Sequence, residues 1–141
     1  MSKLDAIIYV SSAAGMLSSK DVEHILGRAR DRNAEYNVTG LLLFIGGNFM
    51  QYIEGPPSEL NLIYNLILKD PKHVGVIKLM HEPIESREFS NWTMAYCTKD
   101  RAVIVGDSNN QEILDGILEA LSYKKTPARI LLSNFWRKNH S

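Results

Sequence analysis

The chain has 141 residues, of which 45% are hydrophobic and 23% are charged. These proportions are typical of one folded domain with its own core, and they exclude a fibrous or disordered chain and a second full domain. Because 16 Lys and Arg residues balance 16 Asp and Glu residues, no excess positive charge favours general binding to nucleic acid or to anionic membranes.

The first predicted elements are a strand and a helix. Residues 6–10 are β-branched, aliphatic and aromatic, which indicates a strand buried on at least one face. Ser18 and Asp21 have the spacing of a helix start, and apolar residues follow at helical intervals. The apolar stripe consists of Val22, Ile25, Leu26 and Ala29. The helix is predicted to end near Arg32.

A hairpin is predicted next. Residues 38–45 are a nearly continuous apolar run, and the chain returns as a partner strand over residues 48–53. Gly46 and Gly47 lie between the two runs and can supply the positive φ angles of a tight turn.

A second helix is predicted from about Pro57 to Lys69. Proline suits the first turn of a helix. Asp70-Pro71 ends the helix, because proline disfavours helical geometry in the residue before it. The apolar face of this helix consists of Leu60, Ile63 and Ile67.

Two strands and a loop follow. Residues 74–80 and 93–98 are strand candidates, and the polar segment between them is expected to be a loop or a single helical turn. That segment contains Glu85, Arg87 and Glu88. The predicted order is βαββαββ, which fits an α+β sandwich of the ferredoxin-like kind, with two helices on one face of a mixed sheet.

The last part of the chain has a different character. Residues 107–110 break the pattern, residues 113–121 form a strongly amphipathic helix, and Thr126-Pro127 starts a further short helix. A sheet with helices on one face needs cover on the other. We therefore expect residues 1–100 to form the main domain and residues 101–141 to form C-terminal helices that pack on the second face.

Several common active-site patterns are missing from the sequence. Gly46-Gly47 belongs to the predicted hairpin, and no glycine-rich turn suited to phosphates occurs between a strand and a helix. The four histidines lack metal-ligand spacing and have no cysteine pair to join them. Cys97 lies inside a predicted strand rather than in a nucleophile pattern. We expect neither a metal site nor an enzyme.

The sequence also favours a cytoplasmic location. Its single cysteine cannot form an internal disulfide. The N-terminus lacks the apolar region and cleavage site of a signal peptide. No apolar stretch approaches the roughly 20 residues that cross a bilayer, so no membrane role is expected.

Five residues are candidates for a functional site, although each alone has an ordinary explanation. Gln51 either shares a buried strand face and needs a polar partner, or faces solvent from an edge strand. Tyr9 lies among aliphatic residues, either as a phenol with a partner or as a core residue. Asn33 can be a helix C-cap. Trp92 and Met94 lie two residues apart and can be a core pair.

Together with their neighbours, these residues resemble the BLUF family. The resemblance extends in order over about the first hundred residues and agrees with the βαββαββ order. The matching motifs are Tyr9-Val10-Ser11, Asn33 followed by Asn37-Val38-Thr39-Gly40, Gln51-Tyr52-Ile53-Glu54-Gly55, Asp70-Pro71-Lys72-His73 and Phe89-Ser90-Asn91-Trp92-Thr93-Met94.

The resemblance implies a blue-light photoreceptor whose first hundred residues hold a flavin non-covalently between the two helices. The flavin would be FAD, with FMN as the alternative. By position, Asn33 would bind the polar edge of the ring, and Gln51 would lie between the flavin and Tyr9. Tyr9 would donate an electron and a proton on illumination, after which Gln51 would rearrange its hydrogen bonds. Asp70 and His73 match polar residues in contact with the flavin.

The last strand and two departures from the family complete the predicted site. Trp92 and Met94 match the switching segment of the last strand. Asn65 stands where many relatives carry an arginine near the flavin, and Arg32 precedes Asn33 where others have various polar residues. These departures concern contacts at the pyrimidine edge of the ring.

The resemblance also implies a mode of output, and the predicted fold leaves two rival functions. The resemblance implies signalling to a separate protein, such as a cyclic-nucleotide enzyme or a response-regulator-like protein, and a homo-oligomer is expected. The apolar residues between Asn110 and Trp136 form either the output surface or simple sheet cover. One rival is an RNA-binding module, which the missing basic and aromatic pattern disfavours. Another is a small ferredoxin-like enzyme that uses Asp70 and His73 as an acid–base pair.

Overall fold

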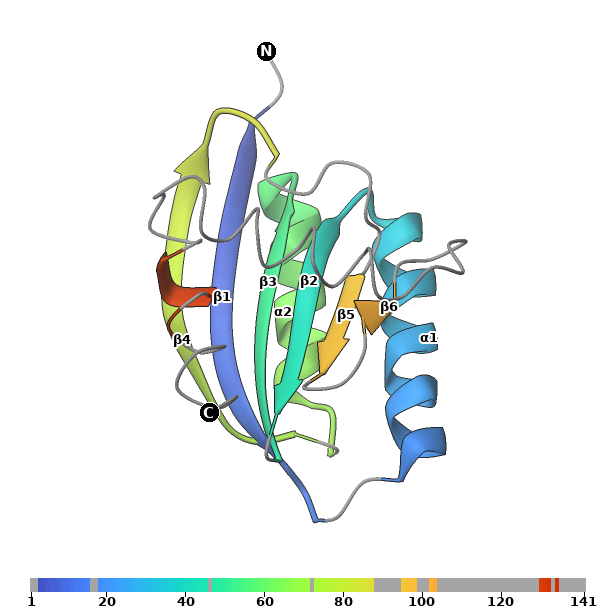
Figure 1. Cartoon of the computed structure of the whole chain (residues 1–141). Coiled ribbons are helices and arrows are strands. Elements are labelled where there is room, and N and C mark those ends of the chain that lie inside the picture. Colours follow the sequence, from blue (N-terminus) through green and yellow to red (C-terminus); the bar gives the residue numbers. More distant parts are fainter. Residues whose placement is uncertain are drawn as a thin grey trace.

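The protein was analysed as a computed structural model that describes residues 3–15, 18–45, 47–71, 73–87, 95–98, 102–103, 130–132 and 134. The elements confirm the predicted βαββαββ order and add a short final strand that the sequence did not predict (Figure 1). They are β1 (Leu4–Ala13), α1 (Ser19–Glu35), β2 (Thr39–Ile45), β3 (Asn48–Gly55), α2 (Pro57–Leu68), β4 (His73–Ile84), β5 (Ala95–Thr98) and β6 (Ala102–Val103).

The strands form one mixed sheet in the order β4-β1-β3-β2-β5-β6. The pairs β1–β4, β1–β3, β2–β3 and β5–β6 are antiparallel, whereas β2 and β5 run parallel. Gly40 and Ile53 face each other in the β2–β3 pair, and a Cβ atom on Gly40 would lie 2.1 Å from the carbonyl oxygen of Tyr52. Only glycine allows the two strands to approach this closely.

Helix α1 begins where the sequence predicted and ends later. The Ser18 hydroxyl accepts the Asp21 N–H, and the Asp21 carboxylate accepts the Ser18 N–H, which forms a capping box. The predicted end near Arg32 was wrong, as was a C-cap at Asn33, because the helix continues to Glu35. The chain turns at Asn37 instead, whose φ of 56° lies in the left-handed region that asparagine tolerates.

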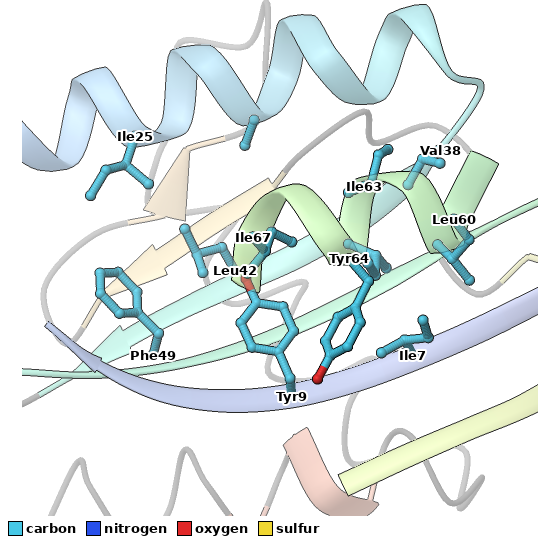
Figure 2. Close-up of a cluster of buried hydrophobic side chains, with 12 residues drawn as sticks. Ile7, Tyr9, Ile25, Val38, Leu42, Phe49, Leu60, Ile63, Tyr64 and Ile67 are labelled. Atoms are coloured by element: carbon cyan, nitrogen blue, oxygen red, sulfur yellow. The ribbon is translucent and has the colours of Figure 1, made fainter. Parts of the chain in front are cut away.

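Helices α1 and α2 pack on one face of the sheet, as predicted (Figures 1 and 2). The core between helices and sheet follows from strand alternation, since every second residue of each strand points to the same face. This core consists of Ile7, Tyr9, Ile25, Ala29, Val38, Leu42, Phe49, Ile53, Leu60, Ile63, Tyr64 and Ile67.

The second face of the sheet is also buried. Ile8, Leu41, Leu43 and Tyr52, which alternate with the core residues, have no more than 1% of their surface exposed. Leu132 is fully buried, and its segment lies on the side of β1 away from α2 (Figures 1 and 2). The other residues of the predicted C-terminal helices lie outside the described part of the chain. In the described part, no helix is long and apolar enough to cross a membrane.

Candidate functional site

Tyr9 and Gln51 form a buried hydrogen-bonded pair at the centre of the sheet. The antiparallel register of β1 and β3 places the two residues directly opposite each other. The Tyr9 hydroxyl donates to Oε1 of Gln51. Tyr9 is 0% exposed and Gln51 is 3% exposed, so Gln51 does not face solvent from an edge strand. The predicted polar partner of each residue is the other.

Burial determines the protonation of Tyr9. Transfer of the hydroxyl into the core disfavours the phenolate and raises the pKa of Tyr9 well above 10.0. The positive charge of Arg32 lowers this pKa, and the negative charge of Asp70 raises it. Burial is the largest of these three effects, so Tyr9 remains a neutral phenol that donates its hydrogen to Gln51.

A pocket lies beside this pair, between the helices and the sheet. Figure 2 shows Tyr9, Ile25, Leu42 and Ile67 in this region. The pocket is formed by α1, by the last turn of α2 and by residues of four strands. The residues that line it are Tyr9, His24, Ile25, Arg28, Ala29, Arg32, Leu42, Gln51, Ile67, Asp70 and His73.

One face of α1 supplies most of the polar wall. His24, Arg28 and Arg32 are spaced four residues apart and therefore lie on the same side of the helix. The buried Nε atom of Arg32 has no hydrogen-bond partner among the described residues. Burial lowers the pKa of Arg32, whereas Tyr9 and Asp70 raise it. In the sequence, Arg32 is only a departure from the family pattern. His24 and Arg28 were not predicted as pocket residues, although their helical spacing was a usable signal.

Asp70 and His73, which the resemblance gives as flavin contacts, also line this pocket. Nδ1 of His73 lies 2.9 Å from the hydroxyl of Ser11 on β1. The His73 ring packs against Phe49, with ring centroids 4.8 Å apart. Burial lowers the pKa of His73, and the neighbouring Asp70 raises it by a smaller amount. His73 is therefore a mostly neutral polar group at pH 7.

The other residues that the sequence singled out either are not among those that line the pocket or lie outside the described residues. Asn33 is 0% exposed in the last turn of α1, next to Arg32, and its backbone carbonyl accepts the N–H of Val38. It is not one of the residues that line the pocket. Asn65 is exposed on α2 and is also absent from the lining. Trp92 and Met94 lie outside the described residues.

The composition of the pocket suits a flat aromatic ligand with polar edges. Ile25, Ala29, Leu42 and Ile67 supply apolar walls. The buried Nε–H of Arg32 is a donor for an acceptor that the described residues do not provide. A flavin ring has apolar faces and an edge of carbonyl and N–H groups, so the residues fit this group. No three His, Cys, Asp or Glu side chains in the described part of the chain could together hold a metal ion.

Known proteins that resemble this chain carry names that refer to light. A family model described as "Sensors of blue-light using FAD" matches residues 4–95. The chain is 34% identical over 100 residues to a photoactivated adenylate cyclase subunit beta of Euglena longa. The matched region is 70% of this chain and 12% of that protein. It is 35% identical over 86 residues to the blue light- and temperature-regulated antirepressor BluF of Escherichia coli K12. This matched region is 61% of this chain and 21% of that protein.

The fold shows the same similarity. The dark-state structure of BlrB, a BLUF protein, matches with a TM-score of 0.67 at 33% identity, over 71% of this chain and 76% of BlrB. By contrast, the chain spans only about an eighth of the cyclase subunit and a fifth of the antirepressor. The similarity therefore concerns the sheet and its two helices, and not the remaining parts of those longer proteins.

Proposed function

The chain belongs to the BLUF family of blue-light sensors, and from this premise we propose that Tyr9 and Gln51 form the light-responsive centre of an FAD site between α1 and α2. The observation that carries this proposal is the buried bond from the Tyr9 hydroxyl to Gln51 at the edge of the pocket. The matched residues 4–95 are a sensor module, so this region turns over no substrate.

The pocket residues divide the binding of FAD between them. The apolar side chains of α1, α2 and β2 contact the faces of the ring. Arg32 donates from its buried Nε–H to an acceptor on the ring edge. Asp70 and His73 would bind polar groups of the flavin. Asn33 does not line the pocket, and its proposed contact with the polar edge of the ring rests on the family resemblance.

When bound, a flavin would supply absorption of blue light and an acceptor for one electron. Tyr9 is the donor, and loss of an electron makes its phenolic proton acidic. Gln51 Oε1 already accepts this hydrogen bond and is therefore in place to receive the proton. The Gln51 amide carries a donor and an acceptor on one planar group, so rotation or tautomerisation changes which group it presents to its neighbours. In a buried site, this change repolarises the adjacent hydrogen bonds.

The signal leaves through the last strand and the C-terminal residues. Trp92 and Met94 respond to the change at Gln51, and the apolar surface between residues 110 and 136 contacts a separate protein in the cytoplasm. The names of the relatives, which include an adenylate cyclase subunit and an antirepressor, support a cyclic-nucleotide enzyme or a transcriptional regulator as the class of partner. A homo-oligomer provides a second route for the same signal.

An absorption measurement tests the proposed function. The purified protein should be yellow, and blue light should shift its visible absorption reversibly to longer wavelength. Release of the cofactor followed by mass spectrometry distinguishes FAD from FMN. A protein that stays colourless after incubation with both flavins would contradict the proposal.

A further inference from the structure

The connection between β4 and β5 must cross most of the sheet. In the order β4-β1-β3-β2-β5, four strand spacings separate the two strands, which amounts to about 19 Å at about 4.8 Å per spacing. The connection starts after Ile84 and ends before Ala95. It contains both Trp92 and Met94, which lie outside the described residues.

Arg87 fixes this connection at the middle of the sheet. Only three residues after β4 ends, its guanidinium reaches the adjoining ends of β2 and β3. Nη2 donates to the carbonyl oxygen of Asn37 at 2.8 Å. Nη1 donates to the Thr39 hydroxyl at 3.0 Å and to the carbonyl oxygen of Glu54 at 3.2 Å. One side chain thus holds three acceptors, one on β2, one on β3 and one in the turn that precedes β2.

A buried carboxylate supports this contact from inside the protein. Glu54 is 0% exposed, and its two oxygens accept from different hydroxyls. Thr39 donates to Oε2 at 2.7 Å and Tyr52 donates to Oε1 at 2.9 Å. The Thr39 hydroxyl therefore accepts from Arg87 while it donates to Glu54. Such a directional chain orders each member, and the opposite charges of Arg87 and Glu54 strengthen it.

We propose that Arg87 is a positioning residue that anchors the start of the 88–94 segment to β2 and β3, with Glu54 as its buried support. The anchor determines where Trp92 and Met94 begin their path toward β5. It also joins that path to β3, the strand that carries Gln51 three residues before Glu54. The effect of the anchor on the light response rests on the proposed function, whereas the anchoring itself does not.

The geometry requires a guanidinium rather than a positive charge alone. Nη1 of Arg87 binds acceptors on β2 and β3, and Nη2 binds the carbonyl oxygen of Asn37 in the turn before β2. A lysine ammonium is a single point that cannot replace this fork. Arg87→Lys should therefore retain part of the anchor, and Arg87→Met should remove it. Glu85→Gln alters a charge in the same connection and serves as the control.

Hydrogen exchange followed by mass spectrometry tests the anchor on the purified 141-residue protein. In Arg87→Met, amides of residues 88–94 should exchange about ten-fold faster than in the wild type, because charge-assisted bonds no longer hold the preceding residue to β2 and β3. Exchange in α2 should stay unchanged, and Arg87→Lys should lie between the two. Unchanged exchange in residues 88–94 of Arg87→Met, or equal acceleration throughout the protein, would overturn the proposal.

If Arg87→Met does not fold, Arg87→Lys decides the question, because wild-type exchange in residues 88–94 of that variant would also overturn the proposal. Lit-state decay adds a readout of function. Arg87→Met should return to the dark spectrum faster than the wild type, with the dark spectrum unchanged. A wild type without any light-induced shift would contradict the proposed function and leave the exchange result to judge the anchor.

Discussion

Each face of β3 buries a tyrosine hydroxyl that donates to an oxygen of a β3 side chain, but the two acceptors differ. On the helix-facing side, Tyr9 donates to the amide of Gln51 beside the pocket. On the opposite side, Tyr52 donates to the carboxylate of Glu54, whose other oxygen is bound by Thr39. Tyr9 and Tyr52 are both 0% exposed, so burial alone does not distinguish the two sides.

The chemical nature of the acceptor makes the difference. An amide offers one donor and one acceptor, so Gln51 has two orientations with different hydrogen bonds. An ionised carboxylate only accepts, and Glu54 gains nothing when its oxygens exchange places. The helix-facing side is therefore suited to change, and the opposite side is suited to hold the strands in place.

The largest expected effect is loss of the light-induced absorption shift when the helix-facing hydrogen bond is removed. Tyr9→Phe and Gln51→Leu should each retain flavin and lose the light-induced shift completely, because each removes one member of the hydrogen bond with little change in volume. Tyr52→Phe is the matched control, since it removes a buried hydroxyl from the other face and should keep the shift. Difference spectra before and after illumination measure the effect. A full reversible shift in Gln51→Leu would show that the role given to the amide is wrong.

The second prediction concerns stability on the opposite side. Glu54→Gln replaces one accepting oxygen by an NH₂ group that faces a hydroxyl already committed as a donor. We expect the free energy of unfolding to fall by about 1–3 kcal/mol, the cost of a buried polar group that loses its partner. Urea unfolding of the purified protein measures this loss. A Glu54→Gln protein as stable as the wild type would argue against a fixed carboxylate network.

A third prediction concerns His73, which lines the pocket, and the pH dependence of the free energy of unfolding. Burial lowers the pKa of His73 below its ordinary value of 6.5, so the unfolded chain binds a proton more readily than the folded chain. The stability that depends on this group is present above pH 6.5 and is lost as the pH falls through the folded pKa. Urea unfolding at pH 7.5 and pH 5.5 should show this loss in the wild type. His73→Gln should reduce it, whereas a replacement of the exposed His24 should not.

The smallest expected effect on stability is that of an ion pair between β1 and β4, away from β3. Nε2 of His81 lies 3.1 Å from the Asp5 carboxylate, and both side chains are partly exposed. Water screens such pairs, so Asp5→Asn should change the free energy of unfolding by less than about 1 kcal/mol and leave the light response intact. A larger loss in the same urea experiment would mean that the β1–β4 edge contributes more than either face of β3.

Local patterns predicted the elements, because strand alternation and turn residues act over a few positions. They left both Tyr9 and Gln51 with ordinary explanations, and only the family resemblance predicted that the two residues lie together. The end of α1 was predicted wrongly, since Asn33 and Asn37 are equally plausible caps and only the fold determines which one turns. The roles of Glu54 and Arg87 could not be predicted, because their partners meet only after the chain crosses the end of the sheet. Trp92 and Met94 remain predictions.

The parallel pairing of β2 with β5 has a consequence for the order of folding. The β2–β3 hairpin joins residues that are close in sequence, whereas Leu41 meets Ala95 only after a long loop has closed. Loop closure costs chain entropy before the contact is gained, so non-local strands join late. We expect β5 to be the last of these strands to form and the first to separate. Opening fluctuations of the folded sheet should then be most frequent at the pairing of β5 with β2.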